Sequence, residues 1–410
     1  MLKYHGKQRK QTAEAVTESL WDDIVMKILI VPMAALAETH GPSSRCGLLA
    51  KGFRDAGTEV ATCMAEDVNF RSMEGVPNWY LDVPMPLGLP KGIAKRTFPI
   101  AQKLGITAKK TVNSFDQVLR FTGNLDYGYL KKSVSSVRKA IREFRPDLVY
   151  SEFNLSAVIA ARKEEIPLCA TVSYPTQYEY AHETGPEKGL NRLLGELRLP
   201  QVDSALRLFD WADRAFCPSI RELEPIEKPN VFYCGALKTG NRKSVPLRER
   251  NKILVYMGNG TISAQETRKT AETAFKDLDF EVYLASAYLK EETRGNLRIA
   301  PRWDFDRLLG EAVLFMNHGG QNSVADGLLY GVPQIVVPGK VFERKYNAGC
   351  LAAHQAGIVI DHADFSAESV RAAAERIFRS GEMAENAAAL GRKLAAAGGV
   401  DAVVREITKR

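Results

Sequence analysis

The sequence has few of the features that mark metal-cluster, membrane-spanning or nucleic-acid-binding proteins. Its six cysteines are scattered over 410 residues and form no Cys-x-x-Cys pair. That spacing argues against a metal cluster or a disulfide framework and favours a reducing cytoplasm. No apolar run approaches the ~18 residues that a membrane-spanning helix needs. The net charge of +7 is too dispersed to argue for nucleic acid, although it suits anionic substrates or an anionic lipid surface.

The chain does have enough length and hydrophobic content for two globular domains. It is 45% hydrophobic and 26% charged, which is ordinary for proteins of that kind. The first 25 residues stand apart, because they are basic and polar and lack the apolar segment of a secretory signal. We expect residues 1–25 to be a flexible extension, or translation to begin at Met26.

Strand and helix patterns alternate along the rest of the chain. An apolar strand pattern at Lys27–Val31 precedes a helical pattern at Ser43–Ala56 that Gly57 can end. A second series of the same kind begins at Lys252–Met257. Alternation of this kind implies parallel sheets with helices on both faces. Further strands are expected at Glu59–Cys63, Leu148–Tyr150, Leu168–Val172, Phe280–Ala285, Leu297–Ala300, Ala312–Met316, Gln334–Val337 and Ile358–Ile360.

We therefore predict an α/β protein with two doubly wound domains. A polar segment that contains Gly and Pro separates the two series and is a plausible linker. The predicted divisions are a first domain at 26–237, a linker at 238–250, a second domain at 251–390 and a C-terminal helix at 391–410.

The most informative stretch is residues 312–348. Its first apolar run has the length of a buried strand, and His318-Gly319-Gly320 then breaks the run. Such a strand–turn–helix unit places backbone N–H groups and a positive helix end at one point, which suits a phosphate. The glycines would let the phosphate approach the backbone closely. A βαβ unit whose glycines merely make turns is the alternative interpretation.

The helix after this turn carries further polar candidates. Asn322 or Ser323 can cap it, and Gly331 can end it in a left-handed conformation. Asp326 lies three residues after Ser323 on the same helix face, where a carboxylate could accept hydrogen bonds from a ribose diol. His318 adds a hydrogen-bond donor that a phosphate-only loop would not need.

Several spacings in this stretch match one known pattern at once. The matching residues are His318-Gly319-Gly320-x-Asn322-Ser323, Asp326, Gly331-Val332-Pro333, Pro338 and Asn347-Ala348. This pattern resembles the donor-binding signature of nucleotide-sugar glycosyltransferases with the GT-B fold. The similarity is greatest to the family 1 type, which includes natural-product and UDP-glycosyltransferases, while MurG-like transferases are more distant. Weaker similarity extends over roughly the whole chain from Met26 onward.

The resemblance implies an arrangement of two Rossmann-like domains that face each other across a cleft. The first domain would bind the acceptor and the second would bind the nucleotide sugar. The last helix would cross back to the first domain at Val400–Ile407. An ordinary helix packed on the second domain is the alternative.

The resemblance also implies a catalytic base near the end of the first strand. His40 matches the histidine base of family 1 members, and the position of its acidic partner aligns to Ser151 or Glu152. A histidine whose pKa is about 6.5 can take the proton of an attacking hydroxyl at neutral pH. A carboxylate behind the ring would fix its tautomer. We take His40 and Glu152 as the candidate pair; a loop histidine that only caps or hydrogen-bonds is the alternative.

Further donor contacts are implied in the second half. The loop Gly258-Asn259-Gly260-Thr261 resembles the phosphate-proximal loop of the family, although a plain turn fits it too. Trp303 could stack on uracil or thymine, although a core position suits tryptophan equally. Glu343-Arg344 align with the Asp-Gln pair that holds sugar hydroxyls, and the arginine leaves room for an acidic or otherwise altered sugar. The candidate donor set is Gly258, Asn259, Thr261, Trp303, His318, Gly319, Gly320, Asn322, Ser323, Asp326, Glu343 and Arg344.

Acceptor recognition is expected from loops of the first domain. The apolar segment around Trp79 and Tyr80 could line an acceptor pocket, and Tyr174 and Tyr178 follow another strand end. Residues 91–110 carry six basic side chains and no acidic one. A basic amphipathic helix there would make peripheral contact with the inner face of a membrane, which would suit a lipid acceptor. A solvated helix face is the alternative.

The sequence therefore predicts an inverting, metal-independent glycosyltransferase. It would move a sugar from a UDP- or dTDP-sugar to a hydroxyl of a small-molecule or lipid acceptor. His318, the nearby N–H groups and the helix dipole would stabilise the leaving diphosphate without a metal or other cofactor. The alternatives are a GT-B epimerase that acts on the nucleotide sugar and a non-catalytic nucleotide-binding partner of a transferase. No nucleic-acid partner is expected, and the sequence does not indicate an oligomeric state.

Overall fold

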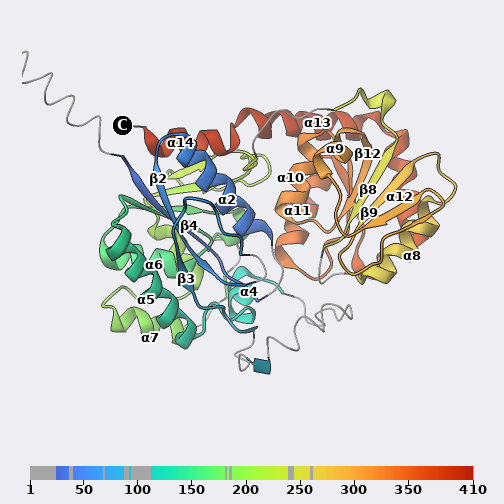
Figure 1. Cartoon of the computed structure of the whole chain (residues 1–410). Coiled ribbons are helices and arrows are strands. Elements are labelled where there is room, and N and C mark those ends of the chain that lie inside the picture. The colour runs from blue at the N-terminus through green and yellow to red at the C-terminus, as the bar shows by residue number, and fades with distance from the viewer. Residues whose placement is uncertain are drawn as a thin grey trace, which may run out of the picture.

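The computed structural model contains two parallel-sheet α/β units (Figure 1). It describes residues 25–36, 40–67, 70–86, 92–93, 112–180, 182–183, 187–238, 244–258 and 262–409. His40 is described by its backbone alone. The predicted α/β class with two doubly wound sheets is confirmed.

The first unit is built on a seven-stranded sheet in which every pairing is parallel. Its strand order is β3-β2-β1-β4-β5-β6-β7. The strands are β1 (Lys27–Pro32), β2 (Glu59–Ala65), β3 (Asn78–Leu81), β4 (Leu148–Glu152), β5 (Leu168–Thr171), β6 (Arg214–Cys217) and β7 (Val231–Tyr233). The described α-helices of this unit are α2 (His40–Asp55), α4 (Phe115–Phe121), α5 (Tyr127–Phe144), α6 (Leu155–Glu164) and α7 (Lys188–Glu196).

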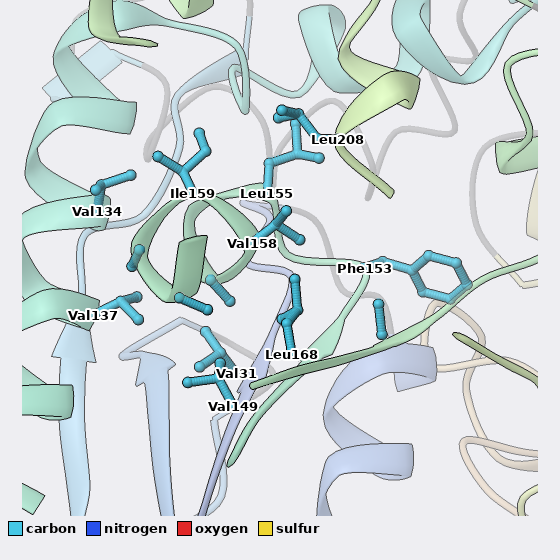
Figure 2. Packing of buried hydrophobic residues seen from close by; sticks show 14 of the residues in the cluster. Val31, Val134, Val137, Val149, Phe153, Leu155, Val158, Ile159, Leu168 and Leu208 are labelled. Atoms are coloured by element: carbon cyan, nitrogen blue, oxygen red, sulfur yellow. The ribbon is translucent and has the colours of Figure 1, made fainter. Parts of the chain in front are cut away.

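Helices cover both faces of this sheet because its central strands are apolar on both faces. Alternate residues of β1 point to opposite sides. Leu29 and Val31 belong to a core that includes residues of α5 and α6, and Figure 2 shows side chains of these two helices meeting those of β1, β4 and β5. Ile28 and Ile30 belong to a second core, which includes residues of α2. A near-continuous apolar strand is thus the signature of a sheet that is buried on both sides.

The second unit has another seven-stranded sheet, with the order β10-β11-β9-β8-β12-β13-β14. Its pairings are parallel except that β10 runs antiparallel to β11. The strands are β8 (Lys252–Tyr256), β9 (Glu281–Ala285), β10 (Glu292–Arg294), β11 (Leu297–Ala300), β12 (Ala312–Asn317), β13 (Gln334–Val336) and β14 (Gly357–Val359). The described α-helices are α8 (Ala264–Phe275), α9 (Phe305–Gly310), α10 (Gln321–Leu329), α11 (Phe342–Ala353), α12 (Ala367–Arg379) and α13 (Gly381–Ala396).

Each sheet has a point at which the direction of winding reverses. In the first sheet it lies between β1 and β4, and in the second between β8 and β12. Ligands of open α/β sheets bind beyond the carboxyl ends of the strands at such a point. The two reversal points therefore direct attention to the residues that follow β1 and β4 and to those that follow β8 and β12.

The last helix, α14 (Gly399–Thr408), packs on the first unit. Val400, Val403 and Val404 share a core with Leu49 and Phe53 of α2. Figure 1 shows the red C-terminal helices passing from the second unit to lie beside α2. No helix among the described residues is both long and apolar enough to cross a bilayer.

Some local expectations differ from the structure. Four strands were not predicted from the sequence, namely β3, β6, β7 and β10, and each has only three or four residues. Ser151 and Glu152 belong to β4 instead of following it. The prediction that Asn322 or Ser323 caps the helix is wrong, because Gly320 is the N-cap and both residues lie in the first turn. Gly331 does adopt the expected left-handed conformation, with φ +64°.

The contact of α14 with α2 depends on a glycine. A Cβ at Gly52 would lie 2.5 Å from a methyl carbon of Val400. We expect Gly52→Ala to force the helices apart and to cost about 1–3 kcal/mol of unfolding free energy, measured by urea denaturation. The matched control is Gly47→Ala on the same helix, where a Cβ would meet nothing within 4 Å. It should be neutral or stabilise by up to about 1 kcal/mol; equal effects of the two substitutions would contradict this packing account.

Candidate functional site

The two reversal points meet at the first turn of α10. Arg45 of α2 donates a hydrogen bond from Nη1 to Oδ1 of Asn322, at 3.1 Å. Next to Asn322, Gln321 donates from Nε2 to Glu224 of the first unit, at 2.7 Å. The carboxyl edges of the two sheets are thus joined through this turn, and side chains from both units line the candidate site.

The turn between β12 and α10 can be made only by glycine. Gly319 has φ +80°, and a Cβ there would lie 2.9 Å from the backbone oxygen of Arg344. Asn317 accepts the Gly319 N–H at 2.8 Å, and the Asn347 amide donates to the Gly319 carbonyl at 2.9 Å. Asn347 of the sequence pattern therefore fixes the backbone of this turn.

The positive end of α10 opens at this turn. Its N-cap is Gly320, which has no side chain with which to bond the first N–H groups. Asn322 and Ser323 occupy the first helical turn, and Ser323 is buried. Free N–H groups and the helix dipole together favour an anion at such an end.

His318 lies between two glycines at this end. A Cβ at Gly320 would lie 2.6 Å from its Nε2, and one at Gly258 would lie 3.2 Å from its Nδ1. The residue is 9% exposed, and its ring stands edge-on to Tyr256, with 5.5 Å between ring centroids. Among the described residues, Nδ1 is buried without a hydrogen-bond partner of normal geometry.

The surroundings of His318 decide its charge. Burial first, and the guanidinium of Arg344 second, lower the pKa of His318 to about 3, against a smaller opposing effect of the Tyr256 backbone. The imidazole is therefore neutral near pH 7. It can donate a hydrogen bond to a bound anion, but it carries no charge in the ligand-free state.

Glu152 lies at the facing edge of the first sheet. Its side chain is fully buried, and Oε1 pairs with Nε of Arg45 at 2.5 Å. Oε2 accepts a hydrogen bond from the hydroxyl of Thr171. Both carboxylate oxygens therefore already have partners. His40 begins α2, five residues before Arg45, and its side chain lies outside the described part of the chain. The role of Glu152 as its partner remains a prediction.

Ser151, the other candidate partner, has a local role. Its hydroxyl donates to the carbonyl of Asn154 at 2.9 Å and accepts the Asn154 N–H at 3.0 Å. These bonds hold the turn that leads into α6, whose N-cap is Asn154.

Other predicted donor residues also lie at this edge. Asp326 forms an ion pair with Lys238, with 2.9 Å between Nζ and Oδ1. Trp303 follows β11 and donates from Nε1 to the Leu284 carbonyl at 3.1 Å. Glu343 and Arg344 lie in the first turn of α11. Burial raises the pKa of Glu343, and the nearby guanidiniums of Arg344 and Arg45 oppose this rise only in part. The predicted residues Asn259 and Thr261 lie outside the described residues.

The candidate acceptor residues are not brought together. Trp79 donates from Nε1 to Glu143 near the C-terminal end of α5, at 2.8 Å. Tyr80 is 53% exposed on the edge strand β3. Tyr178 has Arg207 on its ring, at 3.3 Å from the centroid, and stacks with His182.

Tyr174 alone of these four has a described ring contact with the second unit. Its ring stacks on Tyr346 of α11, with 5.1 Å between centroids.

The segment 91–110 lies outside the described residues apart from 92–93. In the described part of the chain, no three His, Cys, Asp or Glu side chains form a group that could hold a metal ion.

Sequence reasoning missed the residues that join the two units. Arg45 is separated by 107 residues from Glu152 and by 277 from Asn322. Glu224 is a buried carboxyl whose pKa is raised by burial, and it accepts hydrogen bonds from Gln321 and from the Tyr174 N–H. No local sequence pattern indicates such pairs, because only the fold brings their residues together.

Comparisons with known proteins agree with this geometry. The family model described as Erythromycin biosynthesis protein CIII-like, C-terminal domain, matches residues 273–409. NDP-glycosyltransferase YjiC of Bacillus subtilis (strain 168) is 21% identical over 302 residues, which are 68% of this chain and 77% of that protein.

Similar solved structures include CalG4, the calicheamicin glycosyltransferase, and the spinosyn rhamnosyltransferase SpnG. CalG4 has a TM-score of 0.71 and 17% identity, covering 93% of this chain and 97% of that one. SpnG has a TM-score of 0.68 and 16% identity, covering 94% of this chain and 100% of that one. The GT-B fold and the resemblance to family 1 natural-product glycosyltransferases are confirmed, and the matches indicate a glycosyltransferase enzyme.

The neutral state of His318 makes stability depend on pH. Between about pH 6.5 and pH 3, an unfolded imidazole binds a proton that the folded one does not, so stability falls as the pH falls. We expect the wild type to lose stability more steeply than His318→Gln, by up to about 1.4 kcal/mol per pH unit. Urea unfolding at several pH values in this window measures both slopes. Carboxylates titrate in both proteins and contribute to both slopes alike. Equal slopes of unfolding free energy against pH for the wild type and His318→Gln would therefore contradict a neutral buried His318.

Proposed function

We propose that this chain is an inverting, metal-independent glycosyltransferase that moves a sugar from a UDP- or dTDP-sugar to a hydroxyl of a small-molecule or lipid acceptor. The observation that best supports this proposal is the facing of two sheet edges. One edge carries His318 and the open end of α10. The other carries Glu152, Arg45 and the start of α2, where His40 lies.

The edge of the second unit, at the start of α10, would hold the diphosphate of the donor. The first N–H groups of α10, the Ser323 hydroxyl and neutral His318 can each donate a hydrogen bond to phosphate oxygens. These donors are fixed in place, so they can stabilise charge that develops on the leaving group without rearranging. SpnG has been solved with thymidine diphosphate and with spinosyn aglycone, which supports a dTDP-type donor and an aglycone-type acceptor here.

The acceptor end would supply the base. The acceptor hydroxyl must lose a proton as its oxygen attacks the anomeric carbon, and the bond from that carbon to the phosphate oxygen breaks. His40 is the candidate base because α2 begins with it at the carboxyl edge of β1. Direct displacement from an α-linked donor would give a β-glycoside.

A panel of UDP- and dTDP-hexoses tests the proposal. The protein is incubated with each donor in the presence of a chelator, with and without phenolic and macrolide aglycones, and the products are followed by mass spectrometry. We expect an acceptor product heavier by one glycosyl unit, together with free nucleoside diphosphate. An epimerised donor with no transfer, or no consumption of any donor, would reject the proposal.

The role of His40 as the base predicts a specific effect of its substitution. His40→Ala should lower kcat by about 10²–10⁴-fold, the usual contribution of a general base, while the affinity for nucleoside diphosphate stays near that of the wild type. Steady-state kinetics and calorimetric titration measure the two quantities. His362→Ala, in the short 3₁₀ helix His362–Asp364 that follows β14, is the matched control and should leave both near wild type. Near-normal turnover of His40→Ala would show that the base is another group.

A further inference from the structure

Arg45 lies where the two units meet, and its contacts come from both of them. Its side chain is 7% exposed. Nε pairs with Glu152 of the first unit, and Nη1 donates to Asn322 of the second. Nη2 lies 3.7 Å from the position that a Cβ of Gly41 would occupy, beside His40. The guanidinium therefore lies between the start of α2 and the open end of α10.

The backbone next to this guanidinium has an unusual conformation. Phe153, directly after Glu152, has φ +58°, a left-handed conformation that costs a non-glycine residue about 1 kcal/mol or more. The guanidinium carbon of Arg45 lies 5.4 Å from the centroid of the Phe153 ring. An ion pair, an aromatic ring and a cross-domain amide thus hold one cation in place. Such support is typical of a functional position.

The N-terminal end of α10 supplies little positive charge for a diphosphate, and the guanidinium of Arg45 lies next to it. A nucleoside diphosphate is strongly anionic, whereas His318 is neutral and the helix end supplies only about half a positive charge. Arg344 and Arg45 each have a carboxylate beside them, Glu343 and Glu152 respectively, so the two cations differ in their hydrogen-bond donors and not in net charge. A guanidinium has five N–H donors, and in the described part of the chain the hydrogen bonds of Arg45 use only Nε and Nη1.

We infer that Arg45 is a diphosphate-binding residue that the acceptor unit contributes to the donor site. Its Nη groups bind the phosphate that carries the sugar, while Nε stays on Glu152. That phosphate is assigned because, on the proposed function, the nucleoside lies on the second unit and the sugar end of the donor faces the first. This inference rests on the proposed function and adds to it guanidinium N–H donors for the leaving group.

The test compares nucleotides that differ by one phosphate. Calorimetry measures the binding of uridine and thymidine diphosphates, and of the corresponding monophosphates, to the full chain. Arg45→Gln should raise the Kd of the diphosphates at least tenfold and that of the monophosphates less than threefold. The control is Arg54→Gln, in the last turn of the same helix and hydrogen-bonded to the Glu74 carbonyl, which should change neither.

A second variant separates binding from support of Glu152. Arg45→Gln leaves a buried carboxylate unpaired and is expected to lower the Tm. Arg45→Gln/Glu152→Gln removes both charges, so its Tm should recover while the diphosphate Kd stays at least tenfold raised. Recovery of diphosphate affinity in the double variant would overturn the inference, because Arg45 would then act only by holding Glu152.

The outcomes also separate this inference from the proposed function. Equal losses for diphosphate and monophosphate, or no loss for either, would overturn the role of Arg45 and leave the transferase proposal standing. A wild-type protein that binds none of the four nucleotides would overturn both.

Discussion

A fully buried carboxylate needs a cation beside it, and in this protein the pairing of Glu152 with Arg45 links the parts of the cleft. Glu152 ends β4, and Arg45 belongs to the helix that begins at His40. The same guanidinium reaches Asn322 in the second unit. The orientation of α2, the edge of the first sheet and the first turn of α10 are therefore set together. The C-terminal helix α14 packs on the far end of α2 and supports that arrangement.

The donor side is shaped by glycines more than by charged groups. Gly258, Gly319 and Gly320 let a histidine ring and a helix end pack closely, and each position is too crowded or too strained for a side chain. The enclosed ring loses its charge, since burial opposes protonation. A neutral hydrogen-bond donor such as His318 and a helix dipole suit an anion that must bind and later leave. On this account, further hydrogen-bond donors come from the opposite unit, through Arg45.

Sequence patterns predicted the parts of this protein that are local and periodic. The apolar strands, the left-handed Gly331 and the glycine turn that follows His318 all follow from short-range signals. Short strands such as β3 were missed. The residues of β3 instead suggested an acceptor pocket, and among the described residues Trp79 hydrogen-bonds to Glu143 of α5. Arg45 was missed because its partners are far away in sequence. Acceptor specificity resists prediction for the same reason, since it depends on loops with no periodic pattern.

The central claim is that a nucleoside diphosphate binds between the two units at the start of α10. A crystal structure of the protein with thymidine or uridine diphosphate tests it most directly. The account predicts diphosphate oxygens within hydrogen-bonding distance of His318, Ser323 and the first N–H groups of α10, with the base on the side of Trp303. A nucleotide bound away from the carboxyl edge of the second sheet, with the turn after β12 empty, would contradict it.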